Sequence, residues 1–236
     1  MGKQEKIVSM FNDIAGTYDV ANRILSMGID KSWRNKACNK TFELYGKNNI
    51  DKIVDVACGT GDMILFWKQV ASENKIDLKN IIGIDPSVGM MEVGKKKLPD
   101  VEFIEAFATQ MPLESENADI VSISYGIRNV VERQEAFHEF ARVLKKDGLV
   151  VINEFTKNKK EKLLDHVTDF YMNKILPTLG GLISKNKEAY TYLPNSIDEF
   201  LTTENLCKEL KVAGLEPIHV KAFSMNISTL IIAKKL

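Results

Sequence analysis

Short runs of apolar residues recur along the middle of the chain and alternate with segments of helical spacing. Five such runs predict strands, at 52–57, 80–85, 101–107, 118–125 and 148–155. Their nearly continuous isoleucine and valine content is typical of strands buried on both faces, as in a parallel sheet. Helical spacing occupies 61–73, 87–98 and 132–145. This repetition predicts a doubly wound α/β sheet.

Two further apolar runs near the end of the chain, 217–223 and 228–234, predict two more strands. Only four residues separate them, and a connection this short joins antiparallel strands. The sequence therefore predicts a Rossmann-like sheet of seven strands, mostly parallel, with a C-terminal antiparallel hairpin. The link from 107 to 118 is expected to be a loop.

Two segments lie outside this alternation, although all 236 residues are expected to form a single domain. Residues 5–45 have helical spacing that is interrupted at Gly16 and Gly28. Residues 156–200 separate the fifth strand from the hairpin, and apolar residues recur there at helical spacing. An insertion beside strand ends often covers a substrate, and a helix packed on the core is the alternative.

Composition narrows the class of protein. Lysine plus arginine and aspartate plus glutamate number 32 each, so no basic excess argues for nucleic-acid binding. The chain has no run of about 18 apolar residues that would span a membrane, and its N-terminus lacks the apolar core of a signal peptide. Cys38, Cys58 and Cys207 are widely spaced, which favours free thiols over disulfides or a metal site. We therefore expect a cytoplasmic protein that needs no metal.

The stretch DVACGTGD, residues 55–62, follows the first predicted strand. Gly59 and Gly61 permit a tight turn and a close approach of a ligand to the backbone at the start of a helix. A dinucleotide fingerprint would have a third glycine where this chain has Ile64, so a bound pyrophosphate is disfavoured. A NAD-dependent reductase is therefore the weaker alternative.

Asp85 ends the second predicted strand, roughly 20 residues beyond the glycine turn. An acidic residue in this place can accept hydrogen bonds from both hydroxyls of a ribose. The alternative is a helix cap, because Asp85 and Ser87 both precede a helical segment and both are good N-cap residues. The glycine turn and the acid together favour ribose binding.

These features together resemble the class I S-adenosylmethionine-dependent methyltransferases. The resemblance implies that the glycine turn contacts the methionine part of the cofactor and that Asp85 holds the ribose. It places Phe107 and Ala108 against the adenine, with a backbone N–H of Ala108 as donor, and Ser124 near the sulfonium. The remaining cofactor-binding residues that it predicts are Tyr18, Asp55, Gly59, Thr60 and Gly61.

Longer motifs narrow the resemblance. The stretches FNDIAGTYDVANRILSMGIDKSWR (11–34) and SYGIRNVVERQEAFHEFARVLKKDG (124–148) are similar to two signatures of the quinone C-methyltransferases of menaquinone and ubiquinone biosynthesis. The implied reaction is methylation of a ring carbon of a prenylated quinol. Demethylmenaquinol is the preferred substrate, and a benzoquinol precursor of ubiquinone is the alternative. A non-catalytic, cofactor-binding scaffold of a quinone-synthesis complex is a rival of another class.

The chemistry of a quinol assigns roles to the G-I-R-N-V motif. A ring carbon becomes a good nucleophile when the neighbouring hydroxyl loses its proton, and a phenol ionises near pH ~10. Arg128 stays charged, so its predicted role is to stabilise the phenolate or a hydroxide formed from water, and Asn129 would orient that oxygen. Water would then be the base, with His166 or Asp19 as weaker candidates. The alternative for Arg128 is an ion pair that fixes a strand end.

Further residues are predicted to face the substrate. Asn22 lies one helical turn after Tyr18, so both are expected near the cofactor or the ring. Tyr125 and Tyr190 are expected to line an aromatic slot for the quinone, with a place in the core as the alternative. A prenylated substrate resides in the bilayer, so we expect peripheral contact with the inner face of the cytoplasmic membrane through 156–200. The sequence leaves a homodimer open.

The chain also departs from the family. Many relatives have histidine in place of Asp30 and a polar residue in place of Phe107, whose ring can stack on adenine but cannot hydrogen-bond to it. The tail SMNISTLIIAKK lacks the glycine-rich, histidine-bearing ending that is usual in the family. The part of the substrate pocket formed by the tail is therefore expected to differ.

Overall fold

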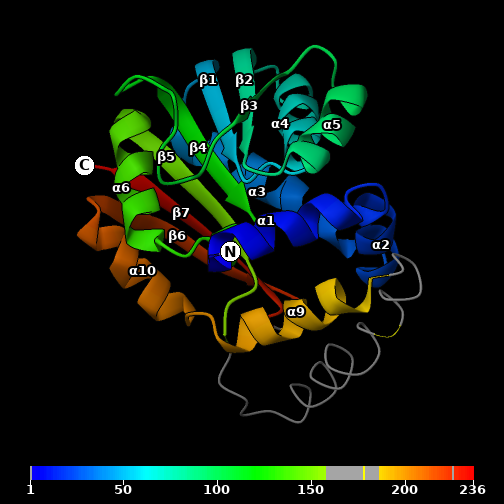
Figure 1. The fold of residues 1–236 in the computed structure, drawn as a ribbon. Coiled ribbons are helices and arrows are strands. Elements are labelled where there is room, and N and C mark those ends of the chain that lie inside the picture. Colours follow the sequence, from blue (N-terminus) through cyan, green and yellow to red (C-terminus); the bar gives the residue numbers. More distant parts are fainter. Residues whose placement is uncertain (1, 158–177, 179–185, 225) are drawn as a thin grey trace.

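The structure is a computed structural model and describes residues 2–157, 178, 186–224 and 226–236. A seven-stranded sheet with the order β3-β2-β1-β4-β5-β7-β6 runs through the molecule (Figure 1). Its strands are β1 (Asn49–Val56), β2 (Asp77–Asp85), β3 (Glu102–Glu105), β4 (Ala118–Ser124), β5 (Leu144–Glu154), β6 (Leu215–Phe223) and β7 (Ser228–Lys235). β1 to β5 pair in parallel, and β7 is antiparallel to both β5 and β6. The predicted sheet with its C-terminal hairpin is confirmed.

Helices cover both faces of the sheet. One face packs against α3 (Ile29–Tyr45), α4 (Asp62–Glu73) and α5 (Val88–Lys97), and the other against α6 (Arg133–Val143) and α10 (Thr203–Val212) (Figure 1). Ile53 and Val54 are adjacent in β1 and both fully buried, yet Ile53 joins the core under α3 and α4, whereas Val54 joins the core under α6. Successive side chains of a strand point to opposite faces, which explains the continuous apolar runs of the sequence.

The N-terminal segment forms three helices, α1 (Lys3–Ile14), α2 (Tyr18–Leu25) and α3. The breaks fall at the two predicted glycines, and at the second the chain turns through two residues with positive φ, Met27 at 51° and Gly28 at 75°. α1 crosses the carboxyl ends of the strands, and α9 (Lys187–Asp198) lies beside it (Figure 1). The predicted apolar stripe with Leu163, Leu164, Val167, Phe170, Tyr171 and Ile175 lies outside the described residues, as does His166.

Candidate functional site

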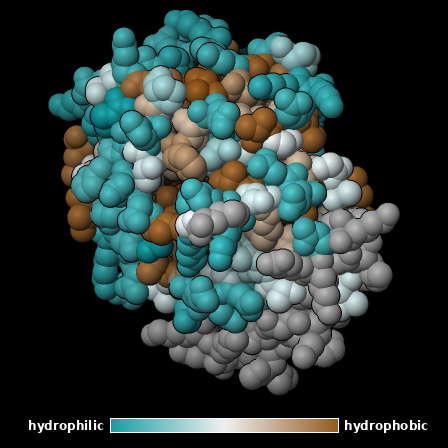
Figure 2. All heavy atoms as spheres, viewed as in Figure 1, coloured by the Kyte–Doolittle hydropathy of each residue, from teal (hydrophilic) through white to brown (hydrophobic). Residues whose placement is uncertain are grey.

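A cavity of about 480 Å³ lies at the carboxyl ends of β1, β2 and β4, with α1 over it. Its volume is within the range of pockets that hold small molecules. In open parallel sheets, ligands bind at this edge, where the strand order reverses between β1 and β4. On the face where α1 crosses the strand ends, apolar residues are interspersed among hydrophilic ones (Figure 2). The cavity is therefore the candidate site.

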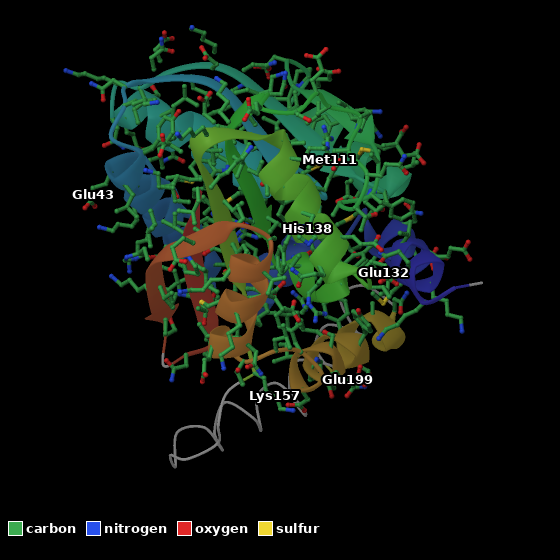
Figure 3. All side chains as sticks on the ribbon, turned by 90° about the vertical axis from the view of Figure 1, so that its left-hand side faces the viewer. Glu43, Met111, Glu132, His138, Lys157 and Glu199 are labelled. Carbon is green, nitrogen blue, oxygen red and sulfur yellow. The ribbon has the colours of Figure 1, made fainter. Side chains whose placement is uncertain are left out.

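Most of the predicted site residues meet at this cavity. It is lined by Tyr18, Asp55, Gly59, Thr60, Asp85, Phe107, Ala108, Ser124, Tyr125 and Asn129. Four other predicted site residues, Asn22, Gly61, Arg128 and Tyr190, are not among its lining residues. Residues of α1 that sequence reasoning missed also line it, including Ile7 and Phe11. Glu132, another lining residue, lies beside α1 (Figure 3).

The carboxylate of Asp85 joins β2 to the glycine turn. Its two oxygens accept hydrogen bonds from the backbone N–H groups of Gly59 and Ser87, each at 2.8 Å. Burial raises the pKa of Asp85 to about 6, although these two hydrogen bonds act in the opposite direction. Ser87 is the N-cap of α5, since its Oγ accepts a hydrogen bond from the N–H of Met90. The cap expected as the alternative thus falls on Ser87, and Asp85 stays beside the cavity.

Gly61 has a packing role in this structure. Its φ is 78°, and a Cβ atom there would lie 2.8 Å from Cδ1 of Leu98, which follows α5. The missing side chain therefore lets the start of α4 approach the segment after α5 closely. A contact between Gly61 and the cofactor stays a prediction.

Asp55 forms the buried floor of the site. Its carboxylate accepts a hydrogen bond of 2.5 Å from the hydroxyl of Ser122, which in turn accepts one of 3.0 Å from the indole N–H of Trp67. Burial raises the pKa of Asp55 to about 7, against the opposing effects of the Ser122 hydrogen bond and the charge of Arg34. The carboxylate of Asp55 is thus anchored to the neighbouring strand β4 through Ser122.

An interhelical charge network, made of Asp19, Arg23, Asp30, Arg34, Asp62 and Lys97, ties the N-terminal helices to the glycine turn. The hydroxyl of Thr60 donates to Asp19 at 2.6 Å, and the ammonium of Lys97 donates to Asp19 at 2.7 Å and to Asp62 at 2.8 Å. Arg23 joins Asp62 to Asp30 by pairing with both. Positive and negative side chains therefore alternate along a path that joins α2 and α3 to the first residue of α4 and the last residue of α5.

Tyr18 is buried and lies within electrostatic reach of Arg34 and Arg128. Burial raises the pKa of its hydroxyl, whereas a hydrogen bond with the side chain of Asn22 and the charges of Arg128 and Arg34 lower it. Tyr18 and Asn22 therefore share a face of α2, as the spacing predicted. Tyr190 packs in the apolar cluster between α2 and α9, and its buried hydroxyl has no partner among the described residues.

Arg128 is engaged in a buried ion pair. Its Nη1 donates to Oε1 of Glu154 at 2.6 Å and to the carbonyl of Tyr125 at 2.8 Å, and its Nε donates to Oγ of Ser196 at 3.3 Å. The ion pair that fixes a strand end, which was the alternative for Arg128, is therefore present. Sequence reasoning missed Glu154, although its position at the end of β5 next to β4 was a signal. A role for Arg128 in the reaction stays a prediction.

Asn129 links the motif to α9, because its side-chain carbonyl accepts a hydrogen bond of 2.9 Å from the hydroxyl of Tyr192. Ser124 and Asn153 are register partners at the ends of β4 and β5, and both carry buried polar atoms without a partner among the described residues. Buried polar groups are normally hydrogen-bonded, so this pattern is typical of a site that a polar ligand completes. Ser124 lines the cavity, and its free hydroxyl fits a contact with the cofactor.

Residues 1–235 match the sequence profile of the ubiE/COQ5 methyltransferase family. The chain belongs to this family. It is 58% identical over its full length, and that of the relative, to the ubiquinone/menaquinone biosynthesis C-methyltransferase UbiE of Campylobacter jejuni. It is 36% identical to the demethylmenaquinone methyltransferase of Chlorobaculum tepidum, over 98% of this chain and 93% of that protein. A solved S-adenosylmethionine-dependent methyltransferase from Thermotoga maritima shares the fold, with a TM-score of 0.65, 18% identity and coverage of 98% and 100% of the two chains.

The chain is therefore an S-adenosylmethionine-dependent methyltransferase, as the motifs predicted. The residues present fit the cofactor. Asp85 offers a carboxylate at the end of β2, and within the described part of the chain the buried hydroxyl of Ser124 has no partner. Membership of this family decides against the NAD-dependent reductase.

Proposed function

We propose that this methyltransferase acts on a ring carbon of a prenylated quinol, with demethylmenaquinol as the preferred substrate. The names of the relatives support a quinone substrate, and one of them is a demethylmenaquinone methyltransferase. The observation that carries the proposal is the position of the G-I-R-N-V motif. Tyr125 and Asn129 line the cavity next to Ser124, while Arg128 donates a hydrogen bond to the backbone carbonyl of Tyr125. A benzoquinol precursor of ubiquinone is the second candidate, because the name of the Campylobacter relative includes both pathways.

When bound, S-adenosylmethionine supplies the electrophilic methyl group. Asp85 accepts hydrogen bonds from the ribose hydroxyls, and the backbone of Ala108 and the ring of Phe107 hold the adenine. The hydroxyl of Ser124 would lie near the sulfonium. These contacts would leave the part of the cavity beside Asn129 and the ring of Tyr125 for the quinol ring.

Arg128 lowers the energy of the phenolate that the reaction requires. Contacts within the described part of the chain engage Nε and Nη1, and Arg128 is not among the residues that line the cavity, so we expect its charge to act on the phenolate from outside the cavity wall. Asn129 orients the ionising oxygen, and a water molecule removes the proton. Asp19 is a poor base here, because its carboxylate is already bound by Thr60 and Lys97.

Mass spectra of the quinones from a host that lacks this protein test the proposal. We expect demethylmenaquinone to accumulate, and the purified enzyme to methylate demethylmenaquinol with S-adenosylmethionine. Accumulation of a ubiquinone precursor alone would instead support the benzoquinol. Intact cofactor binding without methylation of either quinol would support the non-catalytic scaffold and overturn the proposal.

A bilayer-resident substrate requires contact with the membrane, and we propose that α2 provides part of it. No helix among the described residues is long and apolar enough to cross a membrane. The charged residues of α2 point into the interhelical charge network, so its exposed face is apolar. Exposed apolar side chains on α2 and the turn after it are Val20 at 57%, Ile24 at 52%, Met27 at 85% and Ile29 at 44%. The exposed Lys31 follows them and suits anionic lipid.

The apolar surface of α2 would act in addition to the membrane contact expected through 156–200. Most of that segment lies outside the described residues. Flotation with vesicles of phosphatidylcholine and phosphatidylglycerol tests the contact through α2. Ile24→Glu and Met27→Glu should each reduce binding, because a charge on the apolar face opposes insertion. Val212→Glu, at a side chain 70% exposed on α10, is the matched control and should bind as wild type does. If Ile24→Glu instead converts a dimer to a monomer, a second copy of the chain covers this surface.

A further inference from the structure

Arg34 lines the cavity beside Tyr125 and belongs to the interhelical charge network. It belongs to α3, its side chain is 9% exposed, and it lines the cavity together with Tyr18, Asp55 and Asp62. Its guanidinium carbon lies 5.1 Å from the centre of the Tyr125 ring. Sequence reasoning gave Arg34 no role, although it ends the first signature motif.

The hydrogen-bonding capacity of Arg34 is only partly used, although the carboxylates of Asp30, Asp55 and Asp62 all interact with its charge. Its Nη1 donates to Asp30, but Asp30 also accepts hydrogen bonds from Arg23 and from the hydroxyl of Ser26. One carboxylate therefore serves two guanidinium groups. The Nε of Arg34 is buried and has no partner within the described chain. Buried guanidinium groups are normally paired, so this one can accommodate a further anionic acceptor.

The position of Arg34 in the cavity wall indicates which anionic group of a ligand it could bind. The basic residues that line the cavity are Lys3 and Arg34. Lys3 is exposed in the first turn of α1, whereas Arg34 is buried and is linked through Asp30 and Arg23 to Asp62, which directly follows the glycine turn. Within the cavity wall, Arg34 is thus the buried cation that the charge network joins to the glycine turn, where the amino-acid part of the cofactor is expected.

We propose that Arg34 binds the α-carboxylate of the amino-acid part of S-adenosylmethionine. The planar guanidinium donates from its free Nε, and Asp30 holds it in place from the other side. The inference concerns the cofactor and does not depend on the identity of the quinol. It also explains why the network fixes α3 to α2 and to the glycine turn, because the carboxylate can be reached only when these elements are docked.

Isothermal titration calorimetry with two ligands tests the proposal. S-Adenosylhomocysteine carries the α-carboxylate, and 5′-methylthioadenosine has the same adenine, ribose and thioether without the amino-acid part. Arg34→Gln should weaken binding of S-adenosylhomocysteine by about 10–100-fold, the usual loss for one charge-assisted hydrogen bond. Binding of 5′-methylthioadenosine should change by less than about twofold, since no contact with Arg34 is lost. Arg34→Lys keeps the charge without the planar fork and should restore part of the affinity.

Arg23→Gln is the matched control, because Arg23 shares Asp30 but does not line the cavity. Any change that it causes should be the same for both ligands. An equal loss for both ligands in Arg34→Gln would make Arg34 a scaffold residue and overturn the proposal. Unchanged binding of S-adenosylhomocysteine with lowered quinol turnover would also overturn it, since the guanidinium would then serve the quinol. Should Arg34→Gln not fold, Arg34→Lys decides alone, and equal effects on both ligands refute the proposal.

Failure of the Arg34 proposal can be distinguished from failure of the proposed function. If Arg34→Gln weakens binding of S-adenosylhomocysteine but not of 5′-methylthioadenosine, and the wild-type protein methylates no quinol, only the quinol substrate is refuted. If the wild-type protein methylates a quinol and Arg34→Gln affects both ligands equally, only the role of Arg34 is refuted.

Discussion

Substitution of Arg128 should lower both the stability of the protein and its turnover, and the two effects can be measured separately. Arg128 and Glu154 are 6% and 0% exposed at their side chains, so Arg128→Ala leaves a buried carboxylate without its cation. Breaking a buried pair from one side costs about 3–5 kcal/mol. Backbone N–H groups of Arg128 and Phe155 still donate to Glu154 after the substitution, which places the cost near the lower limit. For a chain of this size, about 3 kcal/mol lowers the melting temperature by about 6–12 °C.

The expected effect on turnover has a different origin. If Arg128 stabilises a phenolate that forms during the reaction, its loss lowers turnover per folded molecule by about 10²–10³. The double variant Arg128→Met with Glu154→Met removes both charges and should recover most of the melting temperature, because apolar pairs replace buried ion pairs well. Its turnover should stay low. Arg128→Lys should rescue turnover only in part, since it lacks the planar fork.

Thermal unfolding monitored by circular dichroism and methyl transfer measured per folded molecule are the two assays. Wild-type turnover in the double variant would refute the catalytic role and leave Arg128 as a link between the ends of β4 and β5. A melting temperature of Arg128→Ala within about 2 °C of wild type would refute the reasoning about the buried pair.

Three further predictions follow from single residues. Gly61→Ala should destabilise the fold by about 1 kcal/mol or more in chemical denaturation, because of its positive φ and the close side chain beyond α5. Burial alone would raise the pKa of Asp119, but hydrogen bonds from Tyr45 and Lys145 outweigh it and leave the pKa lowered. The melting temperature lost in Asp119→Asn should therefore be largest above pH ~4 and vanish as the pH falls through the lowered pKa, and an unchanged loss at pH ~2 would contradict this. Asp85→Ala should weaken S-adenosylhomocysteine binding by about 1.5–3 kcal/mol in calorimetry, and unchanged affinity in a folded variant would exclude ribose binding by Asp85.

The order and type of the central elements could be predicted because each strand is buried on both faces and each helix is amphipathic. The boundaries between elements were harder to predict where a helical pattern is followed directly by a strand pattern. The helix predicted to reach 145 ends at Val143, and β5 begins at once with Leu144 instead of at 148. Val143 and Leu144 are both fully buried, so the same apolar pair satisfies the face of a helix and the interior of a strand. Periodicity alone does not separate these two cases.

The candidate site was predictable where it is local in sequence. The glycine turn and the residues at the ends of β2 and β4 were found, because strand ends and turn residues leave a local signature. The partners that complete the site come from distant segments. Glu154 pairs with Arg128 from the next strand, and Arg34 reaches the cavity from α3. No local pattern predicts such pairings, since they depend on how the helices dock.

The placement of α1 shows which contacts settle the docking. Its apolar residues at helical spacing are typical of any helix on a core, so the sequence does not reveal that it crosses the strand ends. Two side-chain amides fix that position. The carbonyl of Asn12 accepts hydrogen bonds of 2.8 Å from the Ser87 hydroxyl and the Gly89 N–H at the start of α5, and Gln4 accepts one of 3.1 Å from the Val131 N–H. These bonds satisfy backbone groups that a helix start and a loop would otherwise leave unpaired.

The charge network extends the same argument to α2 and α3. Asp19, Arg23 and Lys97 each bind at least two partners on different elements, so these three are fully paired only when the helices and the glycine turn are all in place. A network of this kind is stable when complete and costly when partly formed. The cofactor cavity is therefore assembled together with its cover, and a ligand that fills the cavity stabilises the docked helices by mass action. We therefore expect cofactor binding to stabilise the N-terminal helices in their docked position.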